Sequence, residues 1–182
     1  MNTSIVISET KRWLENVVVE LNFCPFAQRE MEKETVRYIV DKSDSMRFRL
    51  ETLVKECQFL DSNADIETSL VIFPAGLESF EHYLDFYYFA EDLLAEEGYE
   101  GVYQIASFHP DYLFADATQD DPANYTNRSP YPMLHLLREN SLEKAISRYP
   151  NPEQIPERNC TLDRELGLPK MKSKLSHCYQ KK

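Results

Sequence analysis

Apolar residues along this chain switch between the spacing of a helix and the spacing of a strand. Near the N-terminus, Ser8 or Thr10 can cap a helix that Asn22 and Pro25 would end. The β-branched and aromatic run 36–40 then predicts a first strand. The apolar stripe of the helix recurs at steps of three and four and comprises Trp13, Leu14, Val17, Val18 and Leu21.

Two further helices and two further strands follow in alternation. A regular apolar stripe predicts a helix from Asp44 to about residue 60, and the continuous apolar run 70–73 is typical of a strand covered on both faces. A third helix over 80–94, which Gly98 would close, leads to a third strand over 102–108.

The second half of the chain is more polar and less regular. An irregular segment extends from residue 109 until Pro130 or Pro132, either of which is suited to open a helix over 133–139. After a proline-containing turn, a short helix is expected up to Gly167.

Strands that alternate with full helices favour right-handed parallel crossovers. We therefore expect an α/β fold: a small, mostly parallel sheet flanked by helices, with an N-terminal helix and a helical C-terminal segment. A chain of 182 residues is long enough for one domain with a hydrophobic core and too short for two independent domains. We predict a single α/β domain over 1–168, followed by a polar, mobile tail over 169–182.

Charge and cysteine content limit the partners and the cell compartment that we expect for this chain. A formal charge of −11 repels the phosphates of nucleic acids and of anionic lipids, so we expect neither nucleic acid nor membrane as a partner. Four cysteines without close pairing, and an N-terminus without the features of a signal peptide, indicate a reduced, cytoplasmic protein. The aromatic helix over 80–94 offers a face for a homodimer.

Candidate chemistry concentrates in the polar segment 109–139. Ligands of α/β sheets bind beyond the carboxyl ends of the strands, and the segment after the third strand is the longest of the loops expected there. If 133–139 is a helix, its polar face carries His135, Arg138 and Glu139. These side chains would either line a pocket or form a solvated face.

His109 and Arg128 each allow a functional and a structural interpretation. His109 follows the third strand, where Pro110 fixes the chain direction. It can act as a general acid or base, or it can have a purely structural role. Arg128 can clamp an anionic substrate or form a salt bridge within the loop. Because Pro130 and Pro132 lack amide donors, an anion bound here would depend on side chains.

Cys24 is the most distinctive thiol, because it lies at a helix end before a proline and outside the apolar stripe. It can be a buried small hydrophobe or a reactive thiolate. A Cys-Pro pair also occurs in thioredoxin-like redox sites, although no second cysteine is close in this sequence. Another alternative is a zinc site formed by Cys24, His109 and His135, which lack the close spacing of strong zinc motifs.

Three long motifs stand out: Leu21-Asn22-Phe23-Cys24-Pro25-Phe26-Ala27, Phe108-His109-Pro110-Asp111-Tyr112 and the stretch from Thr126 to Glu139. They resemble the bacterial domain of unknown function 1415 family, over about Lys11 to Gly167 and including Glu157-Arg158-Asn159. This chain differs from the usual family pattern with Glu20 in place of glycine and Phe23 in place of leucine. The resemblance implies no established activity, but it places eight polar residues at family motif positions: Cys24, His109, Asn124, Asn127, Arg128, His135, Arg138 and Glu139.

Two functions of different class remain open. In the first, the chain is a hydrolase or group-transfer enzyme that acts on a small anionic metabolite, in a polar pocket formed by the 109–139 segment and the Cys24 region. In the second, the same residues form a non-catalytic binding or partner site, or a metal-binding domain. A hydrolase or group-transfer reaction is favoured because the sequence contains no phosphate loop, dinucleotide fingerprint or haem motif, and the cofactor is unknown. The enzyme hypothesis assigns catalysis to Cys24, His109 and His135, and substrate binding to Asn124, Asn127, Arg128, Arg138 and Glu139.

Overall fold

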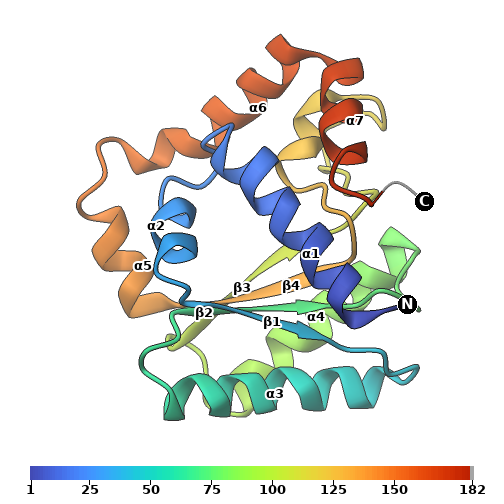
Figure 1. The fold of residues 1–182 in the computed structure, drawn as a ribbon. Coiled ribbons are helices and arrows are strands. Elements are labelled where there is room, and N and C mark those ends of the chain that lie inside the picture. The colour runs from blue at the N-terminus through green and yellow to red at the C-terminus, as the bar shows by residue number, and fades with distance from the viewer. Residues whose placement is uncertain (181–182) are drawn as a thin grey trace.

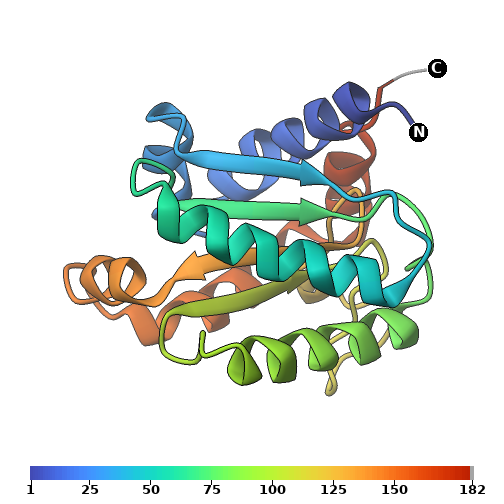
Figure 2. The same ribbon diagram turned by 90° about the horizontal axis from the view of Figure 1, so that it is seen from below.

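Four strands form one mixed sheet with helices on both faces (Figures 1 and 2). The structure is a computed structural model that describes residues 1–180. In spatial order the sheet reads β1-β2-β4-β3; β1 is parallel to β2, and β4 is antiparallel to both of its neighbours. The strands predicted at 36–40, 70–73 and 102–108 are confirmed. The observed bounds are β1 (Val36–Val40), β2 (Thr68–Ile72), β3 (Tyr103–Phe108) and β4 (Met133–Arg138).

Strand β4 corrects two predictions. The helix predicted over 133–139 is wrong, since Met133–Arg138 is a strand, and the sheet is therefore mixed and not mostly parallel. β4 is an inner strand covered on both faces, so most of its side chains are apolar. A short run of this kind fits the period of a helix as well as that of a strand.

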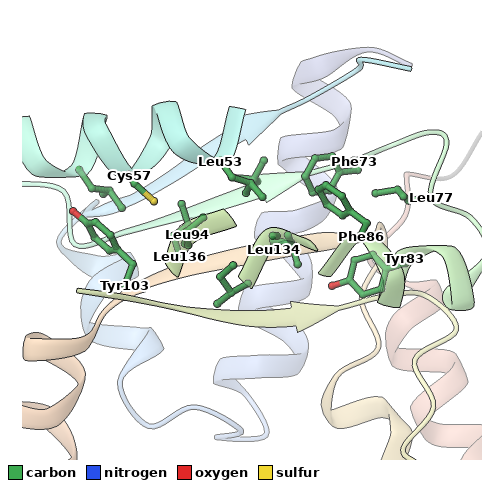
Figure 3. Packing of buried hydrophobic residues seen from close by; sticks show 14 residues of the cluster. Leu53, Cys57, Phe73, Leu77, Tyr83, Phe86, Leu94, Tyr103, Leu134 and Leu136 are labelled. Atoms are coloured by element: carbon green, nitrogen blue, oxygen red, sulfur yellow. The ribbon is translucent and has the colours of Figure 1, made fainter. Parts of the chain in front are cut away.

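Helices α3 (Met46–Ser62) and α4 (Phe80–Glu96) cover one face of the sheet (Figure 2) and confirm the helices predicted from their apolar stripes. Their buried side chains pack with those of the sheet in one cluster, shown in Figure 3. Phe73, after β2, meets Phe86 of α4 edge to face, with ring centroids 5.1 Å apart. Gly98 follows α4 with a φ of +81°, the left-handed conformation that favours glycine after a helix.

The N-terminal helices cover the opposite face. α1 (Thr3–Trp13) continues as a π-helical stretch, η1 (Leu14–Val19), which is followed after a turn by α2 (Ala27–Glu32). The helix begins earlier than predicted, because the side chain of Asn2 accepts a hydrogen bond from Ser4 N and caps it. Within residues 1–180, no helix combines the length and the apolar character needed to cross a bilayer.

The C-terminal part of the chain is helical. α5 (Glu139–Ile146) follows β4 directly. α6 (Ile155–Leu166) and α7 (Leu168–Ser176) follow, and their side chains Leu162 and Met171 pack into the cluster that contains Trp13 of α1. Short 3₁₀ helices, η2 (Pro122–Thr126) and η3 (Pro152–Gln154), occur in the connections. The segment expected as a tail from residue 169 contains most of α7. Its Met171 is fully buried in the hydrophobic cluster that also contains Val6 and Trp13 of α1.

Tyr83 of α4 ties the end of β3 to the beginning of β4. Its side chain is fully buried, and its hydroxyl donates to Met133 O at 2.7 Å and accepts from Phe108 N at 2.9 Å. The two strand ends flank the long connection 109–132, so this hydroxyl holds both sides of the connection at the sheet.

We expect Tyr83→Phe to destabilise the fold by about 1–3 kcal/mol, because a buried amide and a buried carbonyl lose their partner. Urea unfolding measures this change in free energy. Tyr88→Phe, on the exposed side of the same helix, is the matched control and should leave stability unchanged. Equal stability of the two variants would show that the hydroxyl of Tyr83 does not hold the strand ends.

Candidate functional site

A cavity of about 630 Å³ lies between the sheet and the helical layer that contains η1 and α2. It extends over the amino ends of β1 and β2, which contribute Val36 and Thr68, and α5 contributes Ser141 and Leu142 to its wall. Most of its wall is apolar. Apolar side chains from both layers line it: Leu14, Val18, Pro25, Phe26, Met31, Leu70, Phe108, Leu137 and Leu142.

His135 faces this cavity because side chains alternate along β4. Its Nε2 lies 2.5 Å from Thr68 Oγ1, and the same hydroxyl donates to the main-chain oxygen of Leu136. Since that oxygen can only accept, the single hydroxyl proton goes to it, and Thr68 accepts from His135 Nε2–H. This fixes the imidazole tautomer and leaves Nδ1 as an acceptor.

The acceptor of His135 is open to the cavity. Among the described residues Nδ1 has no hydrogen-bond partner, and this atom remains accessible to solvent from the cavity. Burial lowers the pKa of His135 from its ordinary value of 6.5 to about 4, because the surrounding apolar groups disfavour the charged ring. The imidazole is therefore neutral at neutral pH.

Cys24 lines the same cavity from the turn between η1 and α2. The turn is held from α6: Asn159 Nδ2 donates to Phe23 O at 2.8 Å, and Arg158 donates to Asn22 O. Cys24 is exposed, and desolvation by the surrounding groups raises the pKa of its thiol, an effect that the amides of Phe26 and Ala27 only partly offset. Cys24 is consequently a thiol, not a thiolate, at neutral pH.

Exposed cationic side chains surround the mouth of the cavity. Arg29 and Lys33 belong to the α2 end of the wall, and Lys144 and Arg148 to the α5 end. Arg29 lies 3.6 Å from Glu30, whereas the other three form no ion pair within residues 1–180. We call Arg29, Lys33, Lys144 and Arg148 the cationic rim.

The other predicted site residues lie elsewhere. His109 is fully buried against the rings of Phe80 and Tyr83, and it does not line this cavity. Its Nε2 donates to Leu77 O at 2.9 Å and its Nδ1 accepts from Asp111 N at 3.0 Å. Both ring nitrogens are thus occupied, and burial lowers the pKa of the imidazole.

Asn124, Asn127 and Arg128 organise the connection between β3 and β4. Asn124 donates to Thr118 O and accepts from Phe114 N, and Asn127 donates to Ser107 O. Arg128 is 5% exposed and stacks on the Tyr125 ring, with 4.8 Å from its guanidinium carbon to the ring centroid. Its guanidinium donates to two main-chain oxygens of the connection, those of Tyr112 and Gln119.

Arg138 and Glu139 join β4 to its surroundings. Arg138 donates to the main-chain oxygens of Leu60 and Ile66, around the end of α3, where carbonyls lack helical partners. Glu139 begins α5, and its amide donates to Val102 O. The structure therefore brings Cys24, His135 and Arg138 to one cavity, although the guanidinium of Arg138 is bound to main-chain oxygens, and it gives the other predicted site residues different surroundings.

The family model described as a protein of unknown function (DUF1415) matches residues 5–173. The chain belongs to the DUF1415 family. The resemblance inferred from the sequence motifs is confirmed. Comparison with curated proteins and with solved structures finds no significant match.

Some motif residues of this DUF1415 chain line the cavity, and others stabilise the backbone of the connection between β3 and β4. The expected pocket was polar and spanned 109–139, but from this segment only His135, Leu137 and Arg138 line the cavity. The three proposed zinc ligands are not brought together, and no group of three or more His, Cys, Asp or Glu side chains within residues 1–180 could hold a metal ion.

Sequence reasoning missed Thr68 and the cationic rim. Thr68 would have been found if β4 had been identified as a strand, because antiparallel pairing with β2 brings Thr68 next to His135. The rim residues carry no such signal, because they lie in or just after two short helices, α2 and α5, with no fixed spacing between them in the sequence.

The low pKa of His135 predicts a dependence of stability on pH. Between pH 6.5 and 4 the unfolded chain binds a proton that the folded chain excludes, so this contribution is complete above pH 6.5 and is lost as the pH falls toward 4. Between pH 7 and pH 4.5 the free energy of unfolding of the wild type should fall by on the order of 2 kcal/mol more than that of His135→Gln, as measured by urea unfolding. His82→Gln, on the exposed side of α4, should retain the wild-type pH dependence. An unchanged pH dependence in His135→Gln would contradict a neutral, buried imidazole.

Proposed function

We propose that this chain binds a small molecule with an apolar body and an anionic group. The observation that carries the proposal is a mostly apolar cavity with a cationic rim, in a chain whose formal charge is −11. This retains the small anionic metabolite expected from the sequence. It replaces the polar pocket expected from the 109–139 segment and the Cys24 region with the mostly apolar cavity between the sheet and α2, which Cys24 and His135 also line.

The apolar wall supports a ligand with an apolar body. Cavities that bind small molecules typically span about 300–1,000 Å³ and have apolar walls with few polar groups, and this cavity of about 630 Å³ lies in that range. Burial of apolar ligand surface contributes about 25 cal/mol for each Å² removed from water. An acyl, alkyl or aryl group fits this environment better than a sugar or a free phosphate.

The rim supports an anionic group at the mouth. Lys33, Lys144 and Arg148 have no carboxylate partner within the described residues, and Glu30 and Glu67 are the two acidic residues of the wall. The local balance is thus positive, opposite to the balance of the whole chain. A carboxylate or phosphate ester at this position would gain several weak attractions that depend on salt.

A second candidate function is enzymatic, as a hydrolase or group-transfer enzyme on the same ligand. It is favoured by the arrangement of His135, whose Nε2–H is fixed by Thr68 while Nδ1 faces the cavity, as in an oriented general base. Cys24 lines the same wall and would be the nucleophile only if its proton were removed.

Octanoate, octyl phosphate and 1-octanol test the proposed ligand class by isothermal titration calorimetry. Both anions should bind more tightly than the alcohol, and Lys144→Gln combined with Arg148→Gln should weaken octanoate binding by about three- to tenfold through loss of two exposed attractions. Arg47→Gln combined with Lys55→Gln removes the same charge from exposed positions of α3, on the other side of the sheet, and should leave binding unchanged.

Two results would overturn the proposal. One is equal affinity for octanoate and 1-octanol; the other is an equal loss of octanoate affinity in the rim variant and the α3 variant, which would reflect net charge and not the rim.

A further inference from the structure

We infer that the natural ligand carries a hydrogen-bond donor, such as a hydroxyl, at the end opposite its anionic group, and that His135 Nδ1 accepts from this donor. The inference rests on the proposed function and narrows its ligand class. Thr68 is assigned the role of a positioning residue, which keeps Nδ1 available as the acceptor.

The first step concerns the direction of the hydrogen bonds. Thr68 Oγ1 has one proton and two partners at 2.5 Å, the Leu136 carbonyl and His135 Nε2. Only one assignment satisfies both partners: the Thr68 hydroxyl donates to the carbonyl oxygen of Leu136, and His135 is protonated on Nε2 and donates to Thr68. A hydroxyl at position 68 thus decides which imidazole nitrogen accepts from the cavity.

The second step concerns the surroundings of the acceptor. The residues nearest to His135 in the sheet, Leu70 and Ala106, are its cross-strand partners on β2 and β3 and line the same cavity without polar side chains. A purely apolar ligand that fills the cavity would enclose Nδ1 without a partner, which is unfavourable. A ligand with a donor at this depth would form the missing hydrogen bond.

The third step concerns the orientation of the ligand. Burial keeps the imidazole neutral at neutral pH, so it attracts a donor and offers no charge to an anion. Arg138 also lines the cavity, but its guanidinium is held by the main-chain oxygens of Leu60 and Ile66. The other cations lie on exposed side chains of the rim, such as Lys144 and Arg148. The anionic group therefore belongs at the mouth and the donor at the sheet, as in an ω-hydroxy acid.

Paired probes measure this preference: alkanoates of six, eight, ten and twelve carbons and the ω-hydroxyalkanoate of each length, titrated by calorimetry at pH 7.5. For at least one length the wild type should bind the hydroxy acid about five- to thirtyfold more tightly than its parent. In His135→Phe, which keeps an aromatic ring without the nitrogens, the preference should disappear or reverse at that length.

Thr68 is tested with an isosteric and a conservative variant. Thr68→Val removes the hydroxyl and should lower the preference for the hydroxy acid, whereas Thr68→Ser should retain it. The ¹⁵N chemical shifts of the His135 ring give an independent readout: Nε2 is protonated in the wild type and Thr68→Ser, and the two nitrogens should become more alike in Thr68→Val. Identical ring spectra in Thr68→Val and Thr68→Ser would overturn the positioning role.

The outcomes separate the inference from the proposed function. Alkanoate binding with no preference for the hydroxy acid at any length would overturn the inference and leave the proposed function in place. A preference that survives in His135→Phe would also overturn it, because another group would then be the acceptor. Failure of every alkanoate and hydroxyalkanoate to bind would contradict both.

Discussion

The insertion of β4 between β2 and β3 determines the other features of this protein. β4 is antiparallel to both neighbours and completes its backbone hydrogen bonds with them, so its register fixes the direction of each side chain. One set of alternate residues packs against α3 and α4 and includes Leu134 and Leu136. The other set faces the N-terminal helices and includes Met133 and His135.

This register explains why neighbouring polar residues have different roles. His135 and Arg138 are three residues apart, and in a helix they would share a face. In the strand they point to opposite faces, where His135 meets the cavity and Arg138 binds carbonyls at the end of α3. A shift of one residue in either direction would exchange these surroundings and place a leucine at the position of His135.

The long connection between β3 and β4 accounts for most of the other polar motif residues. A connection that is partly buried must pair its own backbone groups, and Asn124 and Arg128 do this through contacts with main-chain atoms. Trp13 of α1 adds a further tie, since its indole donates to Arg128 O. The concentration of Asn, Arg and His in this segment therefore reflects the demands of an irregular backbone at least as much as ligand chemistry.

The sequence predicted the elements whose periodicity is unambiguous. The stripe of α3 and the β-branched run of β1 each fit one period only, and the structure confirms both. β4 could not be assigned in this way, because an inner strand with apolar residues on both faces has no alternation. The same ambiguity affects the site, because a helix over 133–139 groups His135 with Arg138 and Glu139, whereas the strand places His135 next to Thr68.

Cys24 and His135 were both predicted as site residues, but nothing in the spacing of the sequence indicates that they share a cavity. Their proximity to one cavity depends on how the turn after η1 is held against α6 and on which face of β4 is turned toward it. Both are long-range properties. The same holds for the cationic rim, which forms only when α2 and α5 approach the cavity from two distant parts of the chain.

The location of the ligand site is the central claim, and a titration of the ¹⁵N-labelled protein with octanoate tests it most directly. The account predicts that amide resonances of residues around the cavity, such as Val18, Phe26 and Leu142, shift together with octanoate concentration, while those of the 109–128 segment stay in place. Shifts concentrated around His109, Asn124 and Arg128, with none around the cavity, would contradict it.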